Sequence, residues 1–347
     1  KTKAELQEEL QNKALSIVGT QYNIGLDIGT GGGKTLLGLK HMANLFHDSV
    51  SFLVLAPKTS IYADWKREAV THGYEYLLSH ITFANYRSIS KQSFQHDWMY
   101  ADECHSLKYS HATWLDSYTL NGGKILGLSG TYPKGNGEKY QMCNAYCPKI
   151  FEYNVNQAID DGMLNNYKIF VHMLPLNNKH TVKKKKKTGG FWKTSEIKDY
   201  GYWERAIRDT DNQAKKMRLR ILRMKAMQMY PTKIEYVKTI LKKIDHTTLI
   251  FVSTQEQADD VCKHSFHSAN KDSEKNLDLF SKGLIYRMSC VEQLSEGKTI
   301  PKLKVGIITH AFSNETKTRQ KIGRFLRLSP EETATIHILC YKNTIDE

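Results

Sequence analysis

The feature that most constrains the fold of this chain is a glycine-rich loop close to its start, between positions 29 and 35. The loop follows the apolar run Ile24–Ile28 and precedes Leu36–Lys40, whose composition predicts a helix. The order strand, glycine loop, helix is typical of a loop that binds phosphate groups. The strict form of the pattern has a glycine six positions before the lysine, where this chain has Ile28. A glycine-rich surface loop without a ligand is therefore the alternative.

Each residue of the loop has a predicted role in holding a nucleoside triphosphate. Glycines let backbone N–H groups turn towards the phosphates, and the helix N-terminus adds a positive dipole. We expect Lys34 to reach the β- and γ-phosphates and the Thr35 hydroxyl to bind Mg²⁺. The residues predicted to bind ATP are Gly29, Thr30, Gly31, Gly32, Gly33, Lys34 and Thr35.

The bulk properties narrow the class of protein. A chain of 347 residues predicts two domains. The net charge of +14 favours a polyanionic partner such as nucleic acid, and solubility alone is the bland alternative. No apolar run approaches the ~18 residues of a membrane span, so we expect no membrane partner. Because the chain is short for two lobes, we expect a virus or mobile element as its source and the cytoplasm of a bacterium or infected host as its location. The six cysteines are scattered, and Cys143 and Cys147 have no second Cys or His pair that would complete a zinc set. We expect all six to be reduced structural thiols of an intracellular protein.

Apolar runs alternate with helical stretches through the first half of the chain, which predicts a mainly parallel sheet flanked by helices. The predicted strands are 51–56, 81–83, 97–101 and 124–129, and the second half adds 167–174, 247–253, 303–309 and 335–340. The pattern breaks between 146 and 164. We therefore expect an α/β fold with a first lobe over 1–160 and a second over 161–347, the latter with a basic, helical insert near 178–230.

The insert combines charge with aromatic residues. The lysine run 183–187 is expected to be a solvated loop, with a phosphate-gripping element or a duplex wedge as the sharper alternative. A helix is predicted over 212–229, ended by Pro231. For the nearby aromatic side chains, packing in a small core is favoured over stacking on bases. These are Phe191, Trp192, Tyr200, Tyr202 and Trp203.

An acidic pair closes the strand that ends at Ala101. Asp102 and Glu103 lie about 70 residues after the glycine loop, where one carboxylate can bind Mg²⁺ and the other can orient or deprotonate a water. Ser129-Gly130-Thr131, at the end of another strand, offers hydroxyls that can hydrogen-bond the acidic pair. An exposed acidic turn and a plain turn are the alternatives.

Near the C-terminus, Gln320, Arg324 and Arg327 belong to one short segment. The two arginines are three residues apart, so on a helix they share a face and are candidates for arginine fingers at a nucleotide site. The alternative is the start of a basic surface helix.

Together these motifs resemble those of superfamily 2 helicases and translocases. Residues 29–35 look like motif I, 55–60 motif Ia, 102–105 a DECH form of the DEAD/DEAH box, and 129–131 motif III. Residues 249–254, 294–301 and 320–327 are similar to motifs IV, V and VI. The run Asp102 to Lys108 and the segment 57–68 lean towards DNA translocases of the Swi/Snf type and their phage relatives, although Cys104, Ile28 and Thr299 depart from that pattern.

The resemblance implies two RecA-like lobes, with Lys34, Asp102 and Glu103 from one lobe and Gln320, Arg324 and Arg327 from the other acting on ATP. It also implies non-sequence-specific contacts to nucleic-acid phosphates, with DNA favoured over RNA. We expect a monomer that acts either alone or with a replication or repair partner. The residues expected to make those contacts are Lys58, Thr59, Thr254, Thr309 and His310. Gln11 is either an adenine-reading residue or an ordinary helix residue. The rival functions are an RNA helicase, a packaging-type motor and an ATP-gated clamp.

Overall fold

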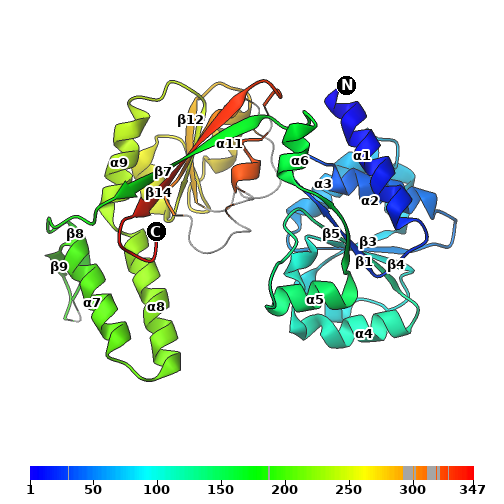
Figure 1. Ribbon diagram of the computed structural model, residues 1–347, viewed down its shortest axis with the longest axis horizontal. Coiled ribbons are helices and arrows are strands. Elements are labelled where there is room, and N and C mark those ends of the chain that lie inside the picture. The colour runs from blue at the N-terminus through cyan, green and yellow to red at the C-terminus, as the bar shows by residue number, and fades with distance from the viewer. Residues whose placement is uncertain are drawn as a thin grey trace. The chain divides into compact units, whose positions relative to one another are not determined.

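The computed structural model divides the chain into two compact units, Lys1–Asn165 and Asn166–Glu347 (Figure 1). It describes residues 1–29, 31–186, 188–291, 300, 302–310, 318, 321–326 and 328–347. In the chain that is described, no helix is long and apolar enough to cross a membrane.

Unit 1 contains a six-stranded parallel sheet in the order β3-β2-β4-β5-β1-β6. Its central strands are apolar runs buried on both faces, the pattern expected when helices cover a parallel sheet on both sides. The strands are β1 Ile24–Ile28, β2 Phe52–Ala56, β3 Ile81–Asn85, β4 Trp98–Asp102, β5 Lys124–Ser129 and β6 Lys149–Tyr153. The α-helices are α1 Lys3–Val18, α2 Lys34–Asn44, α3 Ser60–Thr71, α4 Ala112–Leu120, α5 Glu138–Tyr146 and α6 Val155–Asp160. Short 3₁₀ segments are η1 Glu75–His80, η2 Tyr86–Lys91, η3 Cys104–Ser106 and η4 Tyr109–His111.

Strand β6 lies where the sequence pattern breaks, and the sequence analysis missed it. It pairs with β1 in parallel, with a register shift between Gly25 and Leu26. As an edge strand it buries only Phe151 and Tyr153, while Lys149 and Glu152 stay exposed. A half-exposed strand of this length gives no continuous apolar run to detect.

Unit 2 contains a second six-stranded parallel sheet, in the order β11-β12-β10-β13-β14-β7. Its strands are β7 Asn166–Leu174, β10 Thr248–Val252, β11 Ser265–Phe266, β12 Arg287–Val291, β13 Val305–Ile308 and β14 Thr333–Tyr341. The helices described in this unit are α7 Glu196–Arg208, α8 Gln213–Gln228, α9 Pro231–Leu241, α10 Gln255–Val261 and α11 Ser273–Ser281. Two parallel sheets flanked by helices confirm the predicted fold class, a tandem pair of RecA-like lobes.

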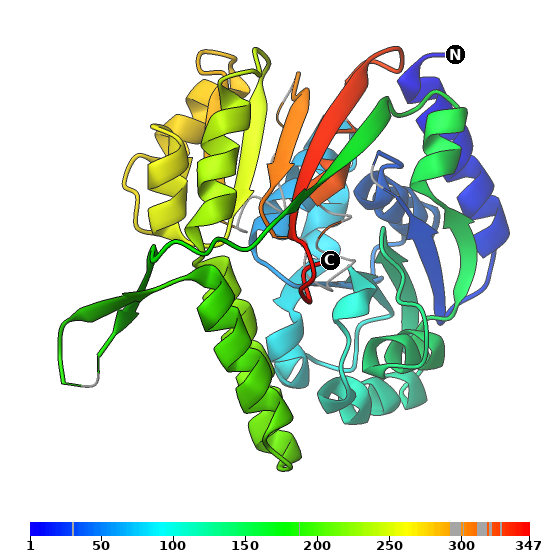
Figure 2. The ribbon, with the colours of Figure 1, turned by 60° about the vertical axis from the view of Figure 1, so that its left-hand side comes forward.

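The insert between β7 and α9 corrects two predictions. Much of the lysine run is not a loop: β8 Val182–Lys185 pairs antiparallel with β9 Phe191–Thr194, because the second segment is rich in residues that favour strands. Pro231 does not end the preceding helix, which stops at Gln228, but occupies the first turn of α9. Proline is favoured there, since its missing N–H would have no helical partner. Figure 2 shows the hairpin and the α7–α8 pair projecting from the body of unit 2.

The aromatic residues of the insert are also more exposed than expected. Phe191 is 68% exposed, Trp192 48% and Tyr202 56%. Tyr200 and Trp203 are half-buried. The prediction of a small aromatic core is therefore wrong for the first three residues.

Candidate active site

The glycine loop joins β1 to α2 and has the backbone shape of an anion-binding turn. Gly33 stands at the N-cap of α2 with φ 71°, and as a glycine it has no side chain that could cap this end of the helix. This φ lies in the left-handed region that favours glycine, so a residue with a side chain would be strained at position 33. A Cβ atom there would also lie 2.4 Å from Gln7 Nε2 and 2.5 Å from Gln11 Nε2, and these amide groups would have to move. The first N–H groups of α2 are thus available to an anion at its N-terminus. Thr35 lies half-buried in the first turn, while Thr30 falls outside the described residues.

Two opposite charges meet beside this loop. Lys34 Nζ lies 3.0 Å from Glu103 Oε1, and about a fifth of each side chain is exposed. Burial acts to lower the pKa of Lys34, but attraction by Glu103 and Asp102 outweighs it and the pKa is raised. Burial acts to raise the pKa of Glu103, but attraction by Lys34 and His105 outweighs it and the pKa is lowered. Both groups are therefore charged at neutral pH, and a triphosphate would compete with Glu103 for the ammonium group.

Asp102 ends β4 and is buried next to this pair. Trp65 Nε1 donates to its Oδ2 at 2.8 Å, and the Tyr86 hydroxyl donates to its backbone carbonyl at 2.8 Å. Burial, followed by repulsion from Glu103, raises the pKa of Asp102 to about 6. Burial and the neighbouring charge therefore disfavour the ionised form of Asp102. A divalent cation bound to this carboxylate would stabilise its charge in place of the missing solvation. The donor set of Asp102 with the Thr35 hydroxyl, all oxygen, is of the type that Mg²⁺ prefers.

Glu103 is held in an unusual backbone conformation that directs the rest of the acidic motif. Its φ is 53°, in the left-handed region that is rare for a residue with a side chain. His105 follows it and lies with Nδ1 3.3 Å from Glu103 Oε2 and 3.0 Å from Ser129 Oγ. Thr131 Oγ1 lies 3.4 Å from the same ring nitrogen. The predicted contact between the Ser-Gly-Thr turn and the acidic motif is confirmed, with His105 as the link that the sequence did not reveal.

Helix α1 lies against the glycine loop. Gln7 Nε2 donates to the Gly31 carbonyl at 3.1 Å, and Gln11 Nε2 donates to the Gly33 carbonyl at 3.3 Å. Gln11 is fully buried, and its Oε1 has no hydrogen-bond partner among the described residues. Gln11 is therefore more than an ordinary helix residue, since its amide group supports the loop. Gln7 was missed by sequence reasoning, because nothing in the sequence links it to residues 24 positions later.

Three cysteines come together behind the acidic motif, which changes the expectation of scattered thiols. The sulfur atoms of Cys104, Cys143 and Cys147 all lie within 4.8 Å of one another, and the three residues are fully buried. They belong to an apolar cluster that includes Met99, Leu107 and Ile125. Structural zinc sites use four ligands, and the described residues offer three here. We therefore interpret the thiols as packing that supports the strand end carrying Asp102 and Glu103.

The candidate residues of the C-terminal segment are only partly described. Arg324 is buried in unit 2, just after Lys321, whose Nζ lies 5.3 Å from the ring centre of Phe251. Gln320 and Arg327 lie outside the described residues. Their predicted role at the nucleotide therefore stays a prediction.

The residues expected to grip nucleic acid fall into two groups. Lys58 and Thr59 are exposed at the start of α3. In unit 2, Thr309 is fully buried and its hydroxyl donates to the Phe251 carbonyl at 3.0 Å, while His310 is 8% exposed. These two side chains do not belong to an open surface in this structure.

A buried lysine explains where Thr309 and His310 are held. Lys233 is fully buried; its Nζ donates to the Thr309 carbonyl at 2.6 Å, lies 3.1 Å from His310 Nδ1, and pairs with Asp346. Burial, more than the attraction of Asp346 can offset, lowers the pKa of Lys233. Sequence reasoning missed this cluster because Lys233 and Asp346 are 113 positions apart.

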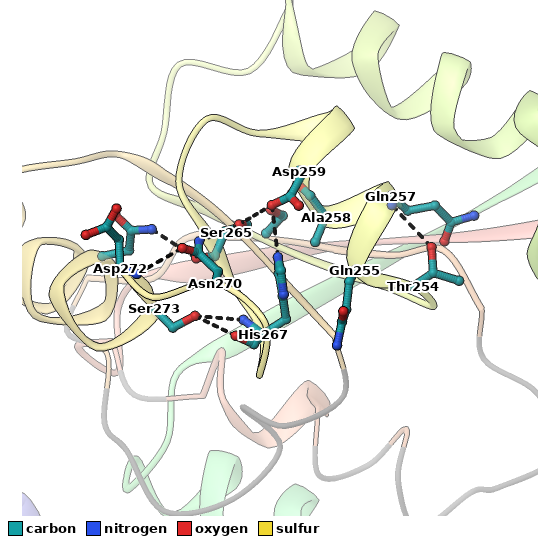
Figure 3. Close-up of polar contacts among 12 residues, drawn as sticks. Thr254, Gln255, Gln257, Ala258, Asp259, Ser265, His267, Asn270, Asp272 and Ser273 are labelled. Atoms are coloured by element: carbon teal, nitrogen blue, oxygen red, sulfur yellow. Dashed lines mark hydrogen bonds and ion pairs between the residues drawn. The ribbon is translucent and has the colours of Figure 1, made fainter.

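Thr254, the remaining candidate, caps helix α10. Its hydroxyl accepts a hydrogen bond from the Gln257 N–H at 3.2 Å (Figure 3). A hollow of about 700 Å³ opens beside this helix, lined among others by Gln255, Asp259 and Asn270. Asp259 is bonded within the hollow, because it accepts from Ser265 Oγ at 2.5 Å and lies 2.9 Å from His267 Nε2.

Comparison with protein families assigns the class of this fold and site. Residues 2–134 match the family model described as "Type III restriction enzyme, res subunit", and residues 232–329 match the "Helicase conserved C-terminal domain". The first match contains the glycine loop and the acidic motif; the second contains α9 to β13 and Arg324. The chain thus carries, in this order, the two domains that are found together in superfamily 2 helicases and translocases.

Solved structures share the fold at low sequence identity. Helicase Lhr of Mycobacterium smegmatis, bound to ssDNA and AMP-PNP, is 12% identical with a TM-score of 0.53, over 95% of this chain and 45% of that one. The Type ISP restriction-modification enzyme LlaBIII, bound to DNA, is 14% identical with a TM-score of 0.62, over 97% and 28%. The Hef helicase domain of Pyrococcus furiosus is 13% identical with a TM-score of 0.52, over 98% and 96%. This chain thus spans less than half the length of the first two. No curated protein matches the sequence.

Proposed function

We propose that this chain hydrolyses ATP with Mg²⁺ and couples the hydrolysis to movement along a nucleic-acid strand. The observation that carries the proposal is the pairing of Lys34 with Glu103 at 3.0 Å, beside a helix N-terminus whose N-cap residue is a glycine. A cation for the phosphates and a charged carboxylate for the attacking water therefore lie in contact at one anion-binding turn.

Each side chain has a separate task in this proposal. Lys34 binds the β- and γ-phosphates, Glu103 accepts a proton from the attacking water, and Asp102 with Thr35 holds the metal. Mg²⁺, when bound, neutralises the charge that develops on the phosphates. His105 connects Glu103 to Ser129, so that a change at the acid reaches the end of β5 through one ring.

From the family resemblance we assign Gln320, Arg324 and Arg327 to the same nucleotide. Cations supplied from a second lobe make closure of the lobes depend on the γ-phosphate, and hydrolysis then releases them.

DNA is the substrate that we propose, with no preference for sequence and contacts mainly to phosphates. Two of the similar solved structures are of proteins bound to DNA, which supports this choice. The acidic motif Asp102 to Lys108 supports a place near Swi/Snf-type and phage translocases.

We also propose that the protein acts in the cytoplasm of a bacterium or infected host.

The test is the rate of phosphate release from ATP with no polynucleotide, single-stranded DNA, duplex DNA, forked DNA and RNA side by side. We expect DNA to stimulate hydrolysis at least ~10-fold and RNA to stimulate it less. Equal or greater stimulation by RNA would make the chain an RNA helicase. Hydrolysis that no polynucleotide stimulates would overturn the proposal.

A further inference from the structure

The positive charge of this protein is concentrated in one segment. Residues 178–230 contain sixteen Lys and Arg and five Asp and Glu, and so contribute +11 of the net charge of +14. The rest of the chain is close to neutral. A polyanion attracted by the charge of this protein is therefore attracted to the insert of unit 2, which consists of β8, β9, α7 and α8.

The register of the β8–β9 hairpin sorts its side chains onto two faces. Lys183 is opposite Lys193, Lys184 opposite Trp192, and Lys185 opposite Phe191. Because successive side chains of a strand alternate, Lys183, Lys185, Lys193 and Phe191 share one face, which we call the outer face. Lys184 and Trp192 share the other.

The face with Lys184 anchors the hairpin to α7. Lys184 Nζ lies 2.8 Å from Asp199 Oδ2 and 5.8 Å from the ring centre of Trp203. Asp199 is buried and also accepts from the Tyr230 hydroxyl at 2.9 Å. A charged pair with this many partners fixes the position of the hairpin on the helix, so the outer face has a defined direction.

The outer face presents charge without compensation. Lys183, Lys185 and Lys193 are exposed, and no ion pair joins any of them to an acid in the described chain. Like charges directly opposite one another destabilise an antiparallel pair, and Lys183 faces Lys193. An anion bound between these ammonium groups would remove that repulsion. Phe191 lies among them and is 68% exposed.

Helix α8 continues the basic surface. It contains six cations and no acid, and it packs along α7 (Figures 1 and 2). One cation, Arg223, forms an ion pair with Glu204, and its guanidinium group lies 5.8 Å from the ring centre of Tyr200. The exposed remainder includes Lys215 with Arg218 at helical spacing i,i+3, which repel each other in the absence of an anion.

We propose that the outer face of the β8–β9 hairpin, together with α8, binds the phosphate backbone of a single nucleic-acid strand, with Phe191 stacking on a base. Lysines at the two-residue spacing of a strand, interrupted by one exposed aromatic ring, suit a backbone with unstacked bases. This inference deepens the proposed function and rests on it, because it places a contact of the same substrate outside the family motifs.

The test measures binding of a fluorescein-labelled single-stranded oligonucleotide by anisotropy over a range of salt concentrations. The variant carries Lys183→Gln, Lys185→Gln and Lys193→Gln, and a matched control carries Lys13→Gln, Lys242→Gln and Lys243→Gln. All six lysines are exposed, so both variants lose the same charge. Each lost phosphate contact reduces the salt slope by about 0.7, so we expect the hairpin variant to lose about 2 from the slope and the control to lose none. A separate Phe191→Ala variant should weaken binding without changing the slope.

The outcomes separate this inference from the proposed function. A wild-type protein that binds no polynucleotide and hydrolyses no ATP would refute both. A wild-type protein that does both, with hairpin and control variants equal in slope, would refute this inference alone. A different result would assign the surface to a membrane instead: the wild-type protein binds vesicles of anionic phospholipid, the hairpin variant does not, and both bind the oligonucleotide equally. Unchanged ATP hydrolysis without polynucleotide shows that the variants are folded.

Discussion

The loop around Lys34 in unit 1 and the hairpin around Lys184 in unit 2 are both lysine sites, but they hold their charges in different ways. Lys34 is largely enclosed and touches a catalytic candidate, Glu103, so its charge is matched before any ligand arrives. On the hairpin only Lys184 is matched, by Asp199, and its neighbours on the outer face are exposed without an acid partner among the described residues. Enclosed and matched charge suits chemistry on a small anion, since it is pre-organised; exposed and unmatched charge suits reversible contact with a long one.

The largest effect is expected where the charge is enclosed. Glu103→Gln keeps the shape of the side chain but removes the group that accepts a proton, so ATP hydrolysis should fall about 10²- to 10⁴-fold. Steady-state phosphate release measures the loss, and circular dichroism with thermal unfolding checks the fold. A fall of less than tenfold would show that another group activates the water. The pairing of Lys34 with Glu103 would then have no catalytic role.

The stability of unit 1 should depend on pH through the buried carboxyl of Asp102. Its pKa of about 6 in the folded protein lies above the unfolded value, so the folded state binds the proton more tightly. The stability that this carboxyl contributes is therefore present at low pH and is lost as the pH rises from about 4 to about 6. Asp102→Asn should stabilise the fold by about 1–3 kcal/mol at pH 7 and by nothing below about pH 4, while abolishing hydrolysis. Urea unfolding at several pH values measures this, and a variant less stable than wild type at pH 7 would contradict it.

The contact between Gln11 and the loop predicts a smaller effect. Gln11→Met fills the same space but removes the amide that donates to the Gly33 carbonyl at 3.3 Å. With loop support lost, affinity for ATP and GTP should fall alike, on the order of 10-fold. Equilibrium titration with both nucleotides measures the change. A loss confined to ATP would instead assign the unpartnered Oε1 to recognition of adenine.

The smallest effect is expected at the buried thiols. Cys104→Ala removes one buried atom from an apolar cluster, so unfolding should become easier by about 1 kcal/mol with hydrolysis within about twofold of wild type. Chemical denaturation and phosphate release measure the two effects. If hydrolysis fell more than tenfold, the thiol cluster would belong to the catalytic apparatus rather than to its packing.

Much of the fold was readable from the sequence because the decisive strands are buried on both faces. Phe52–Ala56, Trp98–Asp102 and Thr248–Val252 are continuous apolar runs, and the residues that follow them carry the motifs. Strand β6 and the β8–β9 hairpin were missed, because edge strands with exposed lysines and glutamate lack the pattern that reveals a buried strand. Strands β11 and β12 were missed as well: β11 has only two residues, and Arg287 and Ser289 interrupt the apolar run of β12.

The candidate site was predictable in its local motifs and not in its distant contacts. Residue types and spacing are enough to identify the loop with Lys34 and the acidic pair Asp102 and Glu103. The support that Gln7 gives to Gly31 and the meeting of Cys104 with Cys143 depend on how elements pack, which no local pattern encodes. The same holds for Lys233 and Asp346 in unit 2.

We propose that the two kinds of lysine site act separately, one on ATP and one on the strand. Titration of ATP hydrolysis with single-stranded DNA tests this separation, for wild type and for the Lys183→Gln, Lys185→Gln, Lys193→Gln variant. We expect equal rates without DNA, equal rates at saturating DNA, and a half-saturating DNA concentration raised on the order of 10-fold in the variant. An unchanged half-saturating concentration, or a lower rate without DNA, would contradict it.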